Sequence, residues 1–246
     1  MISLVSSIIY PSEPIQLASS NFVKIYMVEN SARAAIIFAT GMENSTISRQ
    51  FAPEEEGTLI EYVLDSVWTV ADELIVVFNH EPELSTVEGI SPFGVKVLTT
   101  AKNHDAFQTI CNAFKSAKAE RCLLATERAP LLKPNVVLSL FENAQGHDLA
   151  IPKRPDGKLE PMLAVYRKNA FIRVANSTKF PASKKVEQQI GAVADRLFAV
   201  KYVTDDELRE LDPELDSFLE VKDEKSLQKA REKASTRSKK ILKQVK

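Results

Sequence analysis

One carboxylate stands out by its place in the sequence. The apolar run Cys122–Ala125 has the length of a buried β-strand, and Thr126, Glu127 and a break at Pro130 follow it. In an open α/β sheet, ligands bind outside the carboxyl ends of the strands. A strand that ends in this way presents a charged group to a ligand, so Glu127 is a candidate binding or catalytic residue.

A group of cations forms the second candidate. The segment His147–Pro152 is expected to be a strand, and Lys153, Arg154 and Lys158 lie close together around the turn that follows it. Cations at the carboxyl end of a strand suit a phosphomonoester, and arginine can bind one through two hydrogen bonds. The alternative is that these side chains belong to a solvated turn.

The elements that position these residues alternate between strands and helices. Buried strands are predicted at Ala34–Ala39, Glu73–Phe78, Val95–Leu98, Cys122–Ala125, His147–Pro152 and Leu197–Val203. Amphipathic helices are predicted after Thr58, from Asp105 to Lys118, after Lys133, twice between 167 and 200, after Thr204, and from Ser226 to Ala234. This alternation predicts an α/β fold.

The composition excludes several classes of protein. The chain has 246 residues, with 32 basic and 33 acidic ones and a net charge of −1, so no global field favours a membrane or nucleic acid. Cys111 and Cys122 lie in apolar context and are predicted to be reduced core residues, and the three histidines share no metal-ligand spacing. A cytoplasmic protein is expected.

The two ends of the chain differ from the middle. Residues 1–32 are predicted to be an N-terminal extension in which Ile2–Tyr10 forms a short strand, unless translation begins at Met27. Residues 33–234 are predicted to be the main domain. Residues 235–246 form a basic C-terminal tail without acidic residues, either a solvated helical extension or an arm for nucleic acid.

Glycine is scarce, with seven in the whole chain. A phosphate cradle needs glycines because backbone N–H groups must approach the anion closely. The loop after the first predicted strand, from Thr40 to Gln50, has Gly41 as its only glycine. Arg49 in that loop either binds phosphate or is a solvated loop residue.

Four segments resemble one family. They are LLATERAPLL, AIPKRPDGKLEPMLAVYRK, TLIEYVL and LDPELDSF. The chain resembles the molybdenum-cofactor guanylyltransferases, which are GT-A-type nucleotidyltransferases. In that family an apolar strand ends in Asp-Met-Pro, and a Glu-Pro-Leu-x-Ala-x-Tyr segment follows. The resemblance implies a three-layer α/β/α, Rossmann-like GT-A sheet, with Glu127 at the place of the family's aspartate.

The resemblance also implies roles for individual residues. Arg49 and Glu127 would be catalytic, Glu127 would hold Mg²⁺, and the substrates would be GTP and molybdopterin. Residues implied to contact the substrates are Ala39, Thr40 and Gly41 on the nucleotide side, and Arg154, Glu160 and Pro161 on the pterin side.

The sequence departs from the family at four places on the nucleotide side. The glycine-rich loop is largely lost at Thr40–Gln50, and Glu127 replaces an aspartate. Lys102–Ala106 replaces the family's base-reading Gly-Pro-Leu turn, and Glu220–Glu224 lacks two asparagines that the family has there. Three hypotheses therefore stand. The first is a divergent enzyme that transfers GMP to molybdopterin. The second is a non-catalytic relative that binds pterin or a protein partner. The third is a different nucleotide- or sugar-handling GT-A enzyme.

Overall fold

The computed structural model describes residues 32–40, 51, 57–100, 105–180 and 185–244, with side chains as far as 234. The fold described here belongs to the compact unit of residues 31–246. The predicted strand Ile2–Tyr10, the alternative start at Met27, and the loop residues Gly41 and Arg49 lie outside the described residues.

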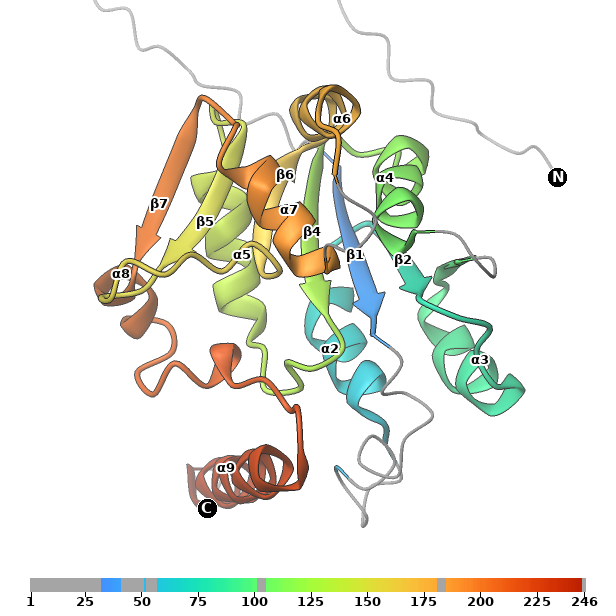
Figure 1. Cartoon of the computed structure of the whole chain (residues 1–246). Helices are drawn as coiled ribbons and strands as arrows, with labels where there is room; N and C mark the ends of the chain where they lie inside the picture. The colour runs from blue at the N-terminus through green and yellow to red at the C-terminus, as the bar shows by residue number, and fades with distance from the viewer. Residues whose placement is uncertain (1–31, 41–50, 52–56, 101–104, 181–184, 245–246) are drawn as a thin grey trace, which may run out of the picture. The chain divides into compact units, whose positions relative to one another are not determined.

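A seven-stranded sheet forms the centre of the fold, in the order β3-β2-β1-β4-β6-β5-β7 (Figure 1). Its strands are β1 (Arg33–Ala39), β2 (Glu73–Phe78), β3 (Lys96–Thr99), β4 (Arg121–Thr126), β5 (Leu149–Lys153), β6 (Ala164–Arg167) and β7 (Val200–Thr204). Only β6 runs antiparallel to its neighbours, β4 and β5, among the strand pairs of the described chain. The six strands predicted between residues 34 and 203 are confirmed, with ends shifted by a few residues.

Helices cover both faces of this sheet. They are α2 (Leu59–Trp68), α3 (Leu84–Ile90), α4 (Ala106–Ser116), α5 (Pro134–Asn143), α6 (Lys168–Ser177), α7 (Val186–Ala194), α8 (Asp205–Arg209) and α9 (Glu224–Gln244). Residues of α4, α6 and α7 pack in one core cluster, and residues of α2, α5 and α8 in another. The three-layer α/β/α fold is therefore confirmed.

The strand β1 shows why the central strands read as unbroken apolar runs. Ile36 and Phe38 belong to the core cluster on the α4 face, while Ala35, Ile37 and Ala39 belong to the cluster on the α2 face. Side chains alternate between the two faces of a strand, and here helices cover both faces and exclude water. Every residue from Ala34 to Ala39 is consequently buried.

The C-terminal helix continues across the predicted boundary at residue 234. Leu227 and Ala230 of α9 are fully buried, in a third core cluster with Leu59 and Leu131. The helix runs on to Gln244, so the domain and the tail share one element. No helix in the described ranges combines the length and the apolar character needed to cross a membrane.

Tyr166 connects this core to the segment that precedes β6. Its side chain is fully buried, with edge-on contacts to Phe114 and Phe171, whose own rings stack 3.8 Å apart. The Tyr166 hydroxyl donates a hydrogen bond of 2.7 Å to the Pro161 carbonyl. The buried phenol thus holds the Glu160–Pro161 segment in place through this hydrogen bond.

We expect Tyr166→Phe to lower the free energy of unfolding by about 1–2 kcal/mol, because it leaves the Pro161 carbonyl without its donor. Urea denaturation followed by circular dichroism measures the change. Tyr202→Phe is the matched control, since Tyr202 is 45% exposed, and it should change stability by less than about 0.5 kcal/mol. Equal effects of the two substitutions would contradict the role of the buried hydrogen bond.

Candidate functional site

The candidate site lies where the chain changes direction across the sheet. From β1 the chain crosses through α2 to β2 on one side, and it later returns to place β4 on the other side of β1. Crevices for ligands form at such switch points, outside the carboxyl ends of the strands. At this point Ala39 is the last residue of β1 and Thr40 follows it, and Glu127 and Arg128 follow β4.

Glu127 is fully buried at the end of β4. Its backbone N–H donates to the Phe38 carbonyl at 3.2 Å, which continues the pairing of β4 with β1. Its Oε1 accepts hydrogen bonds from the Thr40 amide at 2.8 Å and from the Thr40 hydroxyl at 2.7 Å. The carboxylate therefore binds the first amide of the loop that follows β1.

Arg128 is a site residue that the sequence reasoning missed. Its Nε donates to the Thr40 Oγ1 at 3.0 Å, so the Thr40 hydroxyl accepts from Arg128 and donates to Glu127. The Arg128 carbonyl accepts a 2.7 Å hydrogen bond from the Val221 amide, which ties this turn to the segment before α9. The signal in the sequence was its position directly after Glu127, in the turn that departs from the family pattern.

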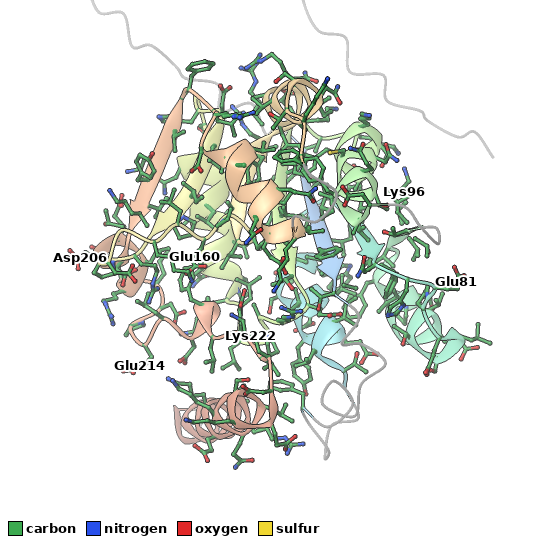
Figure 2. The ribbon with its side chains drawn as sticks, in the orientation of Figure 1. Glu81, Lys96, Glu160, Asp206, Glu214 and Lys222 are labelled. Atoms are coloured by element: carbon green, nitrogen blue, oxygen red, sulfur yellow. The ribbon has the colours of Figure 1, made fainter. Side chains whose placement is uncertain are left out.

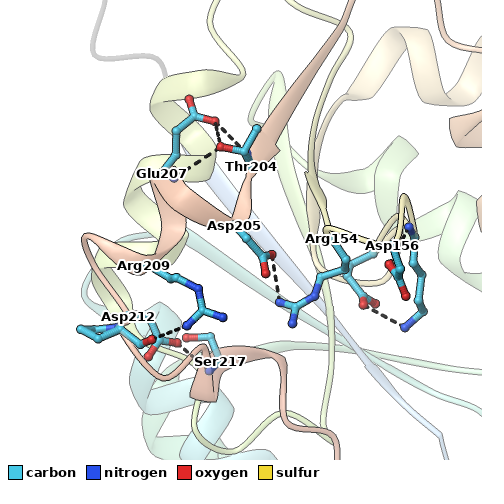
Figure 3. A network of polar contacts seen from close by, with 11 residues as sticks. Arg154, Asp156, Thr204, Asp205, Glu207, Arg209, Asp212 and Ser217 are labelled. Carbon is cyan, nitrogen blue, oxygen red and sulfur yellow. Dashed lines mark hydrogen bonds and ion pairs between the residues drawn. The ribbon is translucent and has the colours of Figure 1, made fainter.

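Arg154 follows β5 at the same edge of the sheet. Its Nη1 lies 3.3 Å from Oδ1 of Asp205, the first residue of α8, and its guanidinium lies 5.0 Å from the centre of the Phe218 ring (Figure 3). Asp205 is buried, and the Arg154 side chain is 24% exposed. The structure thus places this arginine against a carboxylate and an aromatic face.

The two lysines of the predicted cationic group also have partners. Lys158 Nζ donates to Glu160 Oε1 at 2.8 Å, and Lys153 Nζ lies 5.2 Å from the centre of the Tyr202 ring. The hydrogen bond to Glu160 raises the pKa of Lys158 above its ordinary value. The predicted cations lie near one turn, but acids and an aromatic ring engage them.

Glu160, labelled in Figure 2, and Pro161 lie a few residues before the start of β6. Because β6 runs antiparallel to β4 and pairs Ala164 with Leu124, the residues just before β6 extend beyond the carboxyl end of β4. The Glu160 amide donates to the Pro152 carbonyl at 3.2 Å. This predicted pterin-side segment is therefore held next to β4 and β5.

The turn before α9 is joined to the start of α5. Asp212 is fully buried and forms an ion pair with Lys133, and it accepts a 2.8 Å hydrogen bond from the Ser217 amide (Figure 3). The Ser217 hydroxyl in turn accepts from the Lys133 amide at 3.1 Å. Leu215 in this turn has φ of 53°, a strained left-handed conformation for a leucine.

Two groups with possible chemistry lie away from the site. Cys111 and Cys122 are buried free thiols, and burial raises the pKa of each to about 12, so neither is a nucleophile near neutral pH. Their prediction as reduced core residues is confirmed. In the described part of the chain, no group of three or more His, Cys, Asp or Glu side chains could hold a metal ion.

Comparison with known proteins gives the family. The family model described as "MobA-like NTP transferase domain" matches residues 40–192, which is more than half of the chain. The chain belongs to this family. The match begins at Thr40 and includes Glu127, Arg128, Arg154 and Glu160, while Asp205, which pairs with Arg154, lies beyond its end.

Curated relatives cover most of the chain at low identity. A "Probable molybdenum cofactor guanylyltransferase" of Methanosarcina mazei is 24% identical over 200 residues, with 78% of this chain and 87% of the relative covered. A "Molybdenum cofactor guanylyltransferase" of Desulfosudis oleivorans is 24% identical over 174 residues, with 70% of this chain and 80% of the relative covered. The chain thus spans most of the length of each relative.

Solved structures share the fold. Molybdopterin-guanine dinucleotide biosynthesis protein A from Archaeoglobus fulgidus superposes with a TM-score of 0.61 at 22% identity, covering 83% of this chain and 99% of that one. 2-C-methyl-D-erythritol 4-phosphate cytidylyltransferase from Thermus thermophilus superposes with a TM-score of 0.56 at 16% identity, covering 82% and 98%. These likenesses confirm the GT-A-type nucleotidyltransferase fold.

We expect Asp212→Asn to lower the free energy of unfolding by about 1–3 kcal/mol at pH 7, because it removes the charge that pairs with Lys133. Burial raises the pKa of Asp212, but the hydrogen bonds from Lys133 and Ser217 outweigh burial and hold that pKa below its ordinary 3.8. A lowered pKa means that the stabilisation is complete above about pH 4 and is lost as the pH falls through the lowered value.

Denaturant titrations of both proteins between pH 7 and pH 2 measure this effect. The difference between wild type and Asp212→Asn should shrink as the pH falls below 3.8. Asp206→Asn is the control, because Asp206 is exposed in the same region, and it should remain close to wild type. A difference that stays constant down to pH 2 would contradict the paired carboxylate.

Proposed function

We propose that this protein is a nucleotidyltransferase of molybdenum cofactor biosynthesis that transfers GMP from GTP to molybdopterin. The observation that carries the proposal is the cluster of Thr40, Glu127 and Arg128 at the switch point of the sheet, in a chain of the MobA-like NTP transferase family. The names of the curated relatives support the choice of substrates. They favour an active enzyme over the non-catalytic alternative.

The reaction exchanges one phosphoanhydride bond for another. A phosphate oxygen of molybdopterin attacks the α-phosphorus of GTP and forms a new P–O–P bond, while the bond between the α- and β-phosphates breaks and pyrophosphate leaves with the electron pair. The protein must hold the two phosphates in line and balance their charge. Ala39, Thr40, Gly41 and Arg49 are proposed for the nucleotide side, and Arg154, Glu160 and Pro161 for the pterin side.

Glu127 is proposed to hold Mg²⁺, and its chemistry fits that ion. Mg²⁺ prefers oxygen ligands and is usually bound by one or two carboxylates together with substrate phosphates. Bound there, the ion would neutralise phosphate charge. Glu127 Oε1 accepts two hydrogen bonds from Thr40, so the residue would hold the ion from a carboxylate that Thr40 keeps in position.

The remaining parts of the proposal concern the setting of the reaction. We place it in the cytoplasm, since the two cysteines are free thiols, as is usual in a reducing compartment. GTP is proposed as the donor because the relatives are named guanylyltransferases. No nucleic-acid or membrane partner is proposed.

Product formation tests the proposal directly. Purified protein with GTP, Mg²⁺ and molybdopterin should yield the guanine dinucleotide and an equal amount of pyrophosphate, both measured by mass spectrometry and a coupled assay. Glu127→Gln should lower kcat/KM about 100-fold or more, because an amide binds Mg²⁺ weakly. Its oxygen can still accept from Thr40, so the fold should persist.

Glu120→Ala is the matched control, because Glu120 precedes the same strand at its opposite end and forms a partly exposed pair with Arg167. That variant should keep wild-type activity, since exposed ion pairs contribute little. Absence of dinucleotide from wild-type protein with GTP, CTP or ATP would overturn the proposed function. Full activity in Glu127→Gln would overturn the role of Glu127 alone.

A further inference from the structure

Most cations at this edge of the sheet are already engaged by acids. Lys133, Arg154 and Lys158 each form an ion pair, with Asp212, Asp205 and Glu160 respectively. Figure 3 shows the pair of Arg154 and Asp205. A cation whose charge is already balanced by a carboxylate gains less from binding a phosphate than an unpaired one does. The positive charge that the turn at 153–158 suggests is therefore largely neutralised within the protein.

Arg128 differs from these cations. Within the described residues Arg128 forms no ion pair. Of its three guanidinium nitrogens, Nε alone makes a hydrogen bond there, to Thr40 Oγ1. Both Nη groups remain available, and the side chain is partly exposed. That bond places the guanidinium at the start of the loop after β1, beside the switch point of the sheet.

The first backbone amide of the loop after β1 is already engaged and is not available to a phosphate. The Thr40 amide, the first of the loop, is bound by Glu127 at 2.8 Å. Glycines let backbone N–H groups approach phosphate, and Gly41 is the sole glycine from Thr40 to Gln50. A triphosphate at the carboxyl ends of β1 and β4 would need a side-chain cation instead.

We propose that Arg128 is the principal phosphate-binding cation of the site, using its two Nη groups on the phosphates of the nucleoside triphosphate. This inference rests on the proposed function and names the residue that carries its charge recognition. A guanidinium presents its donors in a fixed fork that matches phosphate oxygens. The Thr40 hydroxyl orients that fork by accepting from Nε, and Glu127 fixes the hydroxyl. Arg128 would thus balance charge on the departing pyrophosphate.

Calorimetric titration with GTP and with inorganic pyrophosphate, each with Mg²⁺, tests the inference. Arg128→Ala should weaken the binding of both ligands about 10- to 100-fold, as expected for the loss of charged hydrogen bonds. Arg128→Lys should lie between Ala and wild type, because lysine keeps the charge without the fork. Arg173→Ala is the matched control, since the Arg173 side chain is 64% exposed on α6, and it should bind as wild type does.

The outcomes separate this inference from the function on which it rests. If wild type binds GTP and Arg128→Ala binds it equally well, Arg128 is not the phosphate-binding residue, and the proposed function stands. If wild type binds neither GTP nor pyrophosphate, both proposals fall. Equal loss in the Lys and Ala variants with a lowered melting temperature would show a structural role, and that would also overturn the inference.

Discussion

The site depends on one buried carboxylate that joins the ends of two strands. Removing a carboxylate from water is costly unless hydrogen bonds compensate it. Glu127 receives that compensation from the amide and the hydroxyl of Thr40, 87 residues away in the sequence. The bonds fix where the loop after β1 begins, and through the same hydroxyl they orient Arg128. The geometry on the nucleotide side therefore follows from the pairing of β1 with β4.

Much of the fold could be predicted because local patterns and the tertiary structure agree. Ala34–Ala39 is apolar throughout since both faces of β1 are covered, and that pattern is visible in the sequence. Thr204 caps α8 as predicted, with the Glu207 carboxylate accepting from the Thr204 amide at 2.7 Å. The family resemblance supplied the α/β/α arrangement, and the matched NTP transferase domain confirms it.

The side-chain pairings of the site could not be predicted in the same way. Lys153, Arg154 and Lys158 are a cationic run in the sequence, but Asp205, which pairs with Arg154, enters from α8 far along the chain. The only signal for Arg128 in the sequence was its place after Glu127, because its contact with Thr40 exists only once β1 and β4 lie side by side. Charge in a site depends on which acids the topology brings to each cation. Composition and local spacing do not contain that information.

The central claim is that the cluster of Thr40, Glu127 and Arg128 is where the triphosphate binds. A crystal structure of the protein with Mg²⁺ and a GTP analogue that resists cleavage between the α- and β-phosphates tests this most directly. We expect the phosphates at the carboxyl ends of β1 and β4, with Arg128 on a phosphate oxygen and Glu127 beside the metal. A nucleotide bound elsewhere, without contact to Arg128 or Glu127, would contradict the claim.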